Sequence, residues 1–271
     1  MTINQEERAC KTWNVLSDTA KNKNLISYKE LGVKTGIHHR AVKYALSLIQ
    51  DYCMDNGYPP LTILVINQNT GKPGGGFIAW DIENSEDGVN KVYGKNWKSL
   101  NNPFGFAETG MTSEDLVDAL INNPDSSSEI YALIKVRGTS QRLFRNALLK
   151  VYNYSCSICG LSIHNALEAC HIIPYSRSDS KQRLEISNGM LLCSNHHKMF
   201  DCGQITINRD CTINYLNTNK NEGDYSTYDK LMTIDLNGKM IGLPDDNKHK
   251  PKKEYLLKHQ KTFNDQDQRS T

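Results

Sequence analysis

Hydrophobic positions near the start of the chain predict a series of helices. Residues 9–20 carry apolar side chains partly on one helical face, and residues 38–55 repeat them at helical spacing. Between them, Ser27 with Glu30 three residues later is the pattern of a capping box, which begins a short helix. Gly36 ends that helix, since glycine is the commonest residue just after a helix C-terminus.

The pattern then changes to short apolar runs separated by turn residues. Residues 61–67 (L-T-I-L-V-I-N) and 77–81 (F-I-A-W-D) are predicted to be strands, with the glycine-rich run 68–76 as the turn between them. Two helices at a tight turn followed by a β-hairpin are the layout of a winged helix-turn-helix. We therefore predict a winged-helix-like DNA-recognition domain over residues 1–82.

Basic residues fall at two places in this predicted domain that suit contact with DNA. His38, His39, Arg40 and Lys43 stand at the start of the second helix of the pair, and Lys72 stands at the tip of the hairpin. A DNA-reading helix presents its N-terminal residues to base edges, while a wing reaches phosphate or the minor groove. The alternative is a solvated basic helix end in a domain that serves only to pack.

The chain changes character after this domain. Residues 83–138 are rich in acidic, Asn, Ser and Gly residues and are predicted to be an acidic, partly ordered spacer that does not touch DNA. Residues 142–154 (R-L-F-R-N-A-L-L-K-V-Y-N-Y) then form an amphipathic helical pattern. Residues 217–271 are expected to be a polar C-terminal extension that packs as a helix or stays loose. Its basic run at 248–253 suits either a solvated tail or non-specific phosphate contact.

Composition narrows the class of protein. The 271 residues are 38% hydrophobic, and no run approaches the roughly eighteen apolar residues of a membrane span. The N-terminus lacks the charged-then-apolar pattern of a signal peptide, so the expected location is cytoplasmic. The net charge is only +2, so any affinity for DNA has to come from local basic patches.

Cysteine spacing indicates a metal site. Eight cysteines would also suit a secreted disulfide scaffold, but Cys156 and Cys159 form a C-x2-C pair, while Cys193 and His196 form a C-x2-H pair. In a chain without a signal peptide, such pairs are typical of metal ligands. Three thiolates and one imidazole complete a closed tetrahedral zinc (Zn2+) site that supports folding rather than catalysis. The alternatives are His197 in place of its neighbour His196, or two unrelated cysteine pairs in a core.

A second set of candidate ligands, suited to a hard divalent cation, is interleaved with the first set in the sequence. His171 lies near the end of a predicted strand, and Asn188 opens the turn into another strand. His197 and Asp201 stand four residues apart in a segment that can form a helix, which places them on one face. An imidazole and a carboxylate so placed can share a Mg2+-like ion and leave positions for water and phosphate.

These motifs resemble the HNH, or ββα-metal, nuclease family. The resemblance is closest to a branch found in bacterial restriction endonucleases, and it covers residues 141–207 through the patterns R-L-F-R-N-A-L-L-K-V-Y, E-A-C-H-I-I-P, N-G-M-L-L and H-K-M-F-D-C-G. It implies a zinc-bound HNH nuclease module over residues 139–216. The expected fold class is therefore α+β, with this module following the winged-helix-like domain.

The resemblance also implies roles. His171 corresponds to the general base and Asn188 to the residue that orients it, through the ring or through its local backbone. His197 corresponds to a ligand of the catalytic metal (Mg2+ or Mn2+), and Asp201 occupies another ligand position. Cys170 departs from the family pattern, because a histidine or aspartate ligand often stands there. Either His197 and Asp201 suffice with water and phosphate, or Glu168 reaches the metal as well.

The expected function is metal-dependent hydrolysis of phosphodiester bonds in double-stranded DNA by a restriction endonuclease that cuts at or near a short site. A homodimer is expected, since each HNH module has one active site and a double-strand break needs two cuts. One alternative is a modification-dependent nuclease that recognises methylcytosine. The other is a zinc-stabilised DNA-binding regulator with an inactive HNH core.

Overall fold

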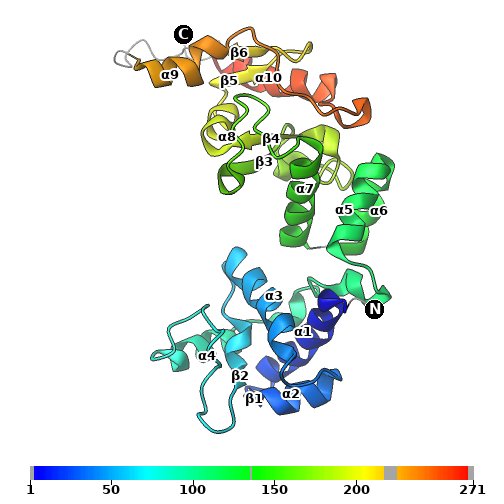
Figure 1. Ribbon diagram of the computed structural model, residues 1–271, viewed down its shortest axis with the longest axis vertical. Helices are drawn as coiled ribbons and strands as arrows, with labels where there is room; N and C mark the ends of the chain where they lie inside the picture. Colours follow the sequence, from blue (N-terminus) through cyan, green and yellow to red (C-terminus); the bar gives the residue numbers. More distant parts are fainter. Residues whose placement is uncertain (1–2, 135, 217–224, 268–271) are drawn as a thin grey trace. The chain divides into compact units, whose positions relative to one another are not determined.

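The chain divides into two compact units in the computed structural model, which describes residues 3–134, 136–216 and 225–267 (Figure 1). Unit 1 comprises residues 1–115 and 133–139, and unit 2 comprises the remainder. Both units combine helices with two-stranded sheets, which confirms the predicted α+β class. Among the residues that are described, no helix has the length and apolar character needed to cross a membrane.

Unit 1 is mainly helical. Its sheet consists of two short parallel strands, in which Ile26 lies opposite Val65 and Ser27 opposite Ile66. In chain order its elements are α1 (Gln5–Lys21), β1 (Ile26–Ser27), α2 (Tyr28–Thr35), α3 (Val42–Asp55), the 3-10 helix η1 (Leu61–Leu64), β2 (Val65–Ile66), α4 (Ser85–Gly94), η2 (Trp97–Ser99) and η3 (Gly105–Thr109).

Trp13 of α1 stands in the middle of an aromatic cluster that forms the core of unit 1. Its ring contacts those of Tyr52, Trp97 and Phe104 edge-on, with centroids 5.5, 5.7 and 6.5 Å apart. Trp97 and Phe104 come from the segment 83–138 that was expected to be a spacer, yet both are buried here. The compact unit thus extends to Asp115, beyond the boundary expected at residue 82.

The short helix α2 begins and ends where the sequence predicts. The Ser27 hydroxyl and the Glu30 carboxylate form both hydrogen bonds of the capping box, and Gly36 takes a left-handed conformation with φ of 70°. The next helix differs from the prediction, because α3 begins at Val42 rather than at His38. The preceding backbone lies against α2 instead, where the Ile37 N–H donates to the Gly32 carbonyl at 3.0 Å.

The predicted β-hairpin over residues 61–81 is not formed, and the wing of a winged helix is therefore absent from the described chain. Leu61–Leu64 forms a 3-10 helix in which every side chain is buried, a pattern that the alternation of a two-faced strand does not give. Around Phe77, the backbone bonds to a side chain instead of a strand: the Gln50 amide oxygen accepts from the Ile78 N–H at 3.1 Å.

Unit 2 contains the predicted nuclease module, and three of its helices, α5, α6 and α7, each have a few residues that belong to unit 1. Its elements are α5 (Ser113–Asn122), η4 (Pro124–Ser126), α6 (Ser127–Ile134), α7 (Arg137–Val151), η5 (His164–Ala166), β3 (Leu167–His171), η6 (Tyr175–Arg177), η7 (Ile186–Asn188), β4 (Gly189–Cys193), α8 (Ser194–Asp201), β5 (Ile205–Ile207), β6 (Ile213–Tyr215), α9 (Thr227–Met232), η8 (Ile234–Leu236), η9 (Asn247–His249) and α10 (Lys253–Asp267).

The centre of unit 2 is an antiparallel pair of strands followed directly by a helix. β3 pairs with β4, with Leu167 opposite Cys193 and His171 opposite Gly189, and α8 begins at the next residue. Glycine is required at 189 because α7 packs closely there: a Cβ atom would come within 2.4 Å of the Phe144 ring. The result is the ββα arrangement that the motifs predict.

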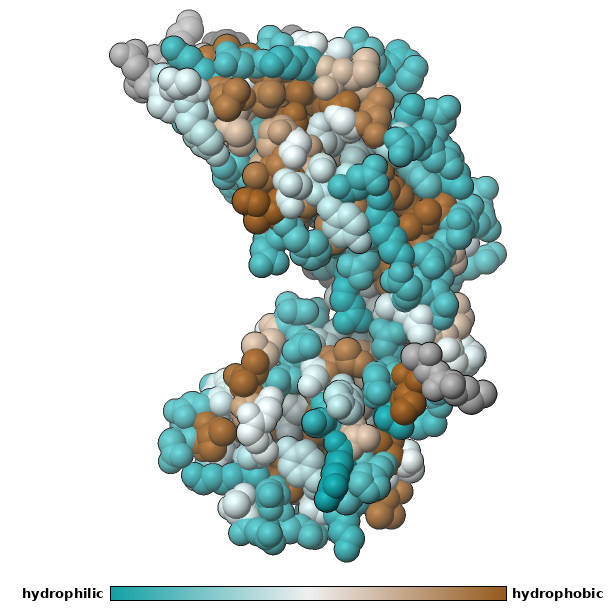
Figure 2. Space-filling model, in the orientation of Figure 1, coloured by the Kyte–Doolittle hydropathy of each residue, from teal (hydrophilic) through white to brown (hydrophobic). Residues whose placement is uncertain are grey.

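The C-terminal extension packs on this centre. Of residues 217–271, the segments 217–224 and 268–271 lie outside the described residues, and the remainder contains α9 and α10. The hydrogen bond from the Gln260 amide to Asn208 at 2.7 Å joins α10 to the loop after β5. Hydrophilic residues cover most of the visible face of each unit, with apolar patches between them (Figure 2).

Candidate active site

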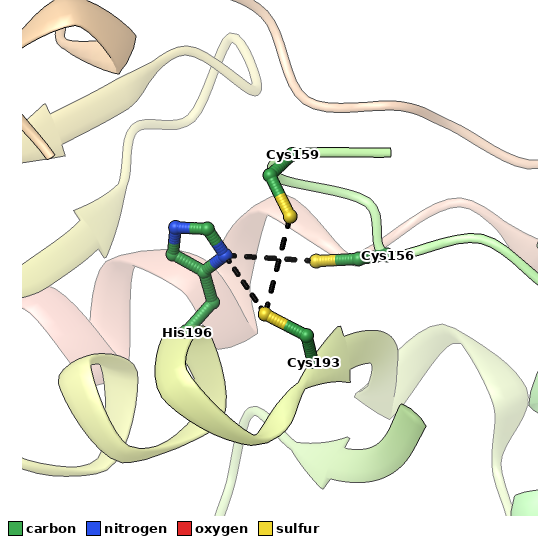
Figure 3. Close-up of side chains that lie close together, drawn as sticks. All are labelled: Cys156, Cys159, Cys193 and His196. Atoms are coloured by element: carbon green, nitrogen blue, oxygen red, sulfur yellow. Dashed lines mark hydrogen bonds between the residues drawn. The ribbon is translucent and has the colours of Figure 1, made fainter. Parts of the chain in front are cut away.

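The side chains of Cys156, Cys159, Cys193 and His196 converge beside α8 (Figure 3). Nδ1 of His196 lies 3.2 Å from Sγ of Cys193 and 3.8 Å from Sγ of Cys156, and the Cys159 and Cys193 sulfurs are 3.9 Å apart. With Zn–S bonds of about 2.3 Å and Zn–N bonds of about 2.0 Å, the ligand atoms of a tetrahedral zinc ion stand about 3.5 to 3.8 Å apart. The four donors therefore fit a zinc ion.

Two further features prepare this cluster for a cation. Nε2 of His196 donates to the Met232 carbonyl at 2.9 Å, which leaves Nδ1 with its lone pair toward the sulfurs. Hydrogen bonds from Cys159 and Cys193 hold the pKa of the Cys156 thiol well below its ordinary value, whereas hydrogen bonds with Cys156 and Cys193 raise the pKa of Cys159. Negative charge therefore gathers on one sulfur of the cluster, where a metal ion would stabilise it.

His171, at the end of β3, is held on both sides. Its ring stacks on Phe144 of α7 with centroids 4.0 Å apart, and Nε2 lies 3.1 Å from the Arg183 carbonyl oxygen. Because a carbonyl only accepts, Nε2 carries the hydrogen and Nδ1 is the basic atom. Burial lowers the pKa of His171 to about 4, so the ring is neutral at pH 7. A neutral imidazole with one basic nitrogen can accept a proton from water.

Asn188 is fully buried and holds the backbone around His171 rather than its ring. Its side-chain oxygen accepts from the Ile173 N–H at 2.9 Å, and its side-chain nitrogen donates to the Gln182 carbonyl at 3.0 Å. Its own carbonyl accepts from the Ile172 N–H. Of the two ways that the sequence leaves open for orienting His171, the observed hydrogen bonds use the local backbone.

His197 and Asp201 lie one turn apart on α8, with Nε2 and Oδ2 3.5 Å apart. Nδ1 of His197 donates to Glu168 of β3 at 2.5 Å, so Nε2 is the ring nitrogen on the side of Asp201 and the one free to bind a metal ion. The Cys170 thiol, His197 and Asp201 each offer a ligand atom within 4.8 Å of the others. A carboxylate that holds the far nitrogen of a histidine is a common way of orienting a metal ligand.

The sequence leaves open whether Glu168 or Cys170 contributes to the metal site, and these two side chains differ in protonation state. Burial raises the pKa of Glu168, but hydrogen bonds from Ser194 and His197 outweigh it and lower the pKa overall. Its carboxylate oxygens are thereby engaged by these two neighbours. Burial raises the pKa of Cys170 well above its ordinary value. Cys170 therefore remains a neutral thiol, which is a poor ligand for a hard cation.

The comparison with known families agrees with this geometry. Residues 156–208 match the family model described as HNH endonuclease. This segment is an HNH domain. It contains β3, β4 and α8, and with them both ligand clusters and His171. No protein among the curated sequences matches the chain.

A cavity of about 310 Å³ lies beside His171 and Asp201 of the HNH domain. Part of its lining comes from α10, through Lys258 and His259 among others. This region was expected to be a C-terminal extension with a basic run, and none of its residues was predicted to belong to the site. Tyr255 and Leu256, four and three residues before His259, were the helical signal that a buried face was present.

The five residues predicted to contact DNA all lie in unit 1 and are exposed. His38, His39 and Arg40 belong to the turn before α3, and Lys43 lies in the first turn of that helix. Lys72 lies in the following loop, where its Nζ is 3.2 Å from a Glu83 carboxylate oxygen. The structure therefore gathers four of the five near one helix end, and their contact with DNA remains a prediction.

Proposed function

We propose that this chain is a metal-dependent endonuclease that hydrolyses phosphodiester bonds in double-stranded DNA. The observation that carries the proposal is one HNH domain with a neutral His171 and, on the adjacent helix, His197 and Asp201 with Nε2 and Oδ2 3.5 Å apart. Hydrolysis of a phosphodiester needs a proton acceptor for the attacking water and stabilisation of the charge that develops on the phosphate.

The side chains divide this work. Nδ1 of His171 takes the proton from the attacking water, while the Arg183 carbonyl and the Phe144 ring keep the imidazole in place. A divalent cation (Mg2+ or Mn2+) bound to His197 and Asp201 would supply charge stabilisation at the phosphate and the leaving oxygen. Zinc on the three cysteines and His196 would stabilise the fold, because the protein fills all four positions.

We further propose a role in a restriction system, in which unit 1 selects the DNA site through His38, His39, Arg40 and Lys43. What supports it is the exposure of these four side chains in a unit that lacks any residue of the HNH domain. Two copies of the chain would supply one active site for each strand, so the proposed working form is a homodimer.

The test is digestion of methylated and unmethylated plasmid by the purified chain, with Mg2+ or Mn2+ and without added metal. Discrete bands on unmethylated DNA would support a restriction enzyme, and bands only on methylated DNA a modification-dependent nuclease. A smear would indicate cleavage without site preference. If neither template is nicked or cut with either metal, the nuclease proposal fails and the DNA-binding regulator takes its place.

A further inference from the structure

The C-terminal helix α10 is fixed to the HNH domain, although it lies outside the family match. Nε2 of His259 donates to the Phe200 carbonyl at 3.1 Å, and the His259 and Phe200 rings stack with centroids 3.7 Å apart and planes within 6°. One turn further along α10, Phe263 lies so close to Gly203 that a Cβ atom there would come within 2.2 Å of the ring. The end of α8, which carries Asp201, is therefore packed directly on α10.

This packing makes α10 a wall of the cavity beside the proposed base and metal ligand. His171, Arg177 and Asp201 of the HNH domain line the cavity together with Lys258 and Thr262 of α10. Its volume of about 310 Å³ is at the lower end of ligand pockets, which begin at about 300 Å³. The space suits a short piece of nucleic-acid backbone rather than a whole duplex.

The charges along this lining are those of an anion site. Arg177 and Lys258 are exposed, and neither has a salt bridge within the described part of the chain. Asp201, which the proposed metal would neutralise, is the one acidic residue in the lining. Two unpaired cations around a proton acceptor are suited to a phosphodiester, because each nucleotide of a DNA strand adds one negative charge.

We propose that α10 is part of the substrate site and that Lys258, together with Arg177, binds backbone phosphates of the DNA strand to be cut. This inference rests on the proposed function, since it places the same DNA in the same cavity. Lys258 supplies a point charge from outside the HNH domain, and His259 holds the helix that presents it. His259 is thus a positioning residue, and Lys258 is a binding residue.

The test measures binding of duplex DNA over a range of KCl concentrations, in full-length protein carrying His171→Ala so that binding is read without cleavage. Lys258→Gln and Arg177→Gln are each expected to reduce the slope of log K against log salt by about 1, which is the effect of one lost phosphate contact. Lys258→Arg should restore the slope. Lys261→Gln is the matched control, because Lys261 is exposed on the same helix but does not line the cavity.

Inorganic phosphate, added as a competitor at constant ionic strength, separates a phosphate site from a DNA-backbone site. We expect inorganic phosphate to compete only weakly with duplex DNA, and equally weakly in the Lys258→Gln variant. If Lys258→Gln and Lys261→Gln give the same slope while the protein with intact His171 cuts DNA, α10 is no part of the substrate site and the nuclease proposal stands. If the slope depends on Lys258 but the protein with intact His171 does not cut DNA, the proposed binding site stands and the proposed nuclease activity is rejected. No binding at any salt concentration overturns both.

Discussion

At the scale of single residues, His171 is the side chain on which the proposed chemistry depends most directly. We expect His171→Ala to retain zinc, folding and DNA binding but to lower the cleavage rate by at least about 10²-fold, the usual contribution of a general base. His164→Ala is the control, since His164 is an exposed histidine of the same domain. Cleavage is measured as nicking of supercoiled plasmid. An unchanged rate for His171→Ala would remove the base from the mechanism.

His197→Ala tests a different part of the same site. This variant should also lose cleavage, but through weaker binding of the metal rather than loss of the proton acceptor. Excess Mn2+ is therefore expected to restore part of the activity of His197→Ala and none of that of His171→Ala. Titration of Mn2+ against the initial rate of nicking measures both. Identical metal dependence in the two variants would contradict the division of roles proposed here.

The thiol cluster gives a prediction about stability. Cys156→Ser or Cys193→Ser should lose the zinc and unfold unit 2, because a structural zinc supplies roughly 10 kcal/mol or more of apparent folding free energy. Cys202→Ser is the control, since this exposed thiol lies outside the cluster. Elemental analysis gives the zinc content, and circular dichroism reports folding. A folded, active parent protein without zinc would disprove the assignment of the metal.

His259 gives a prediction about pH. Burial lowers its pKa to about 4, whereas an unfolded histidine titrates near pH 6.5. Its neutral ring thus contributes stability that is full above pH 6.5 and is lost as the pH falls towards 4. His259→Gln, which does not titrate, should lose about 2 kcal/mol less unfolding free energy than the parent between pH 7 and pH 5. Urea unfolding of the zinc-loaded proteins measures this, and equal losses would refute it.

At the scale of elements, α7 packs tightly against the start of β4. Gly189→Ala places a methyl group where Phe144 and Leu148 already lie, and we expect it to destabilise the protein by about 1 to 3 kcal/mol. Because Phe144 stacks on His171, cleavage should fall as well. Gly242→Ala is the control, since the nearest atom to its new methyl group is 3.5 Å away. Equal unfolding midpoints for the two variants would count against this packing.

The elements that the sequence predicts correctly are those with a local cause. The capping box of α2 involves Ser27 and Glu30, which are three residues apart, and the ββα motif is carried by a family pattern. The predicted hairpin is wrong because the contacts that decide the conformation of this segment come from distant parts of the chain. Gln50 of α3 binds the backbone at Ile78, and Leu61–Leu64 is buried against α1, α3 and α4. An apolar run of that length suits a strand or a buried helical turn equally, and only tertiary contacts decide.

The same distinction applies to the candidate site. Motif spacing predicts the ligand pairs, because the members of each pair stand three or four positions apart: Cys156 with Cys159, Cys193 with His196, and His197 with Asp201. The Arg183 carbonyl that fixes the tautomer of His171 belongs to the backbone, so no residue type signals it. Likewise, His259 lies far from the motifs in sequence and reaches Phe200 only because α10 folds back. These contacts required a structure.

At the scale of the whole molecule, recognition and cleavage are proposed to belong to different units. Replacing His39, Arg40 and Lys43 with Ala should weaken specific DNA binding and flatten its salt dependence, while unit 2 keeps its zinc and its fold. The control replaces Lys21, Lys29 and Lys34, three exposed lysines elsewhere in unit 1. Binding is measured on DNA that contains the cleavage site. Unchanged site preference would exclude this helix end as the reader of sequence.

The contact of Phe263 with Gly203 bears on how an HNH domain of this kind can be inherited and exchanged. The family match ends at residue 208, but Gly203 and Phe200 within it are covered by a helix that begins at Lys253. A gene segment that moved to a new host protein with only the matched residues would arrive with this apolar surface open to water. A recombined gene segment would have to encode α7 and α10 as well as the matched residues in order to conserve activity. The transferable segment is therefore longer than the segment that the family model matches.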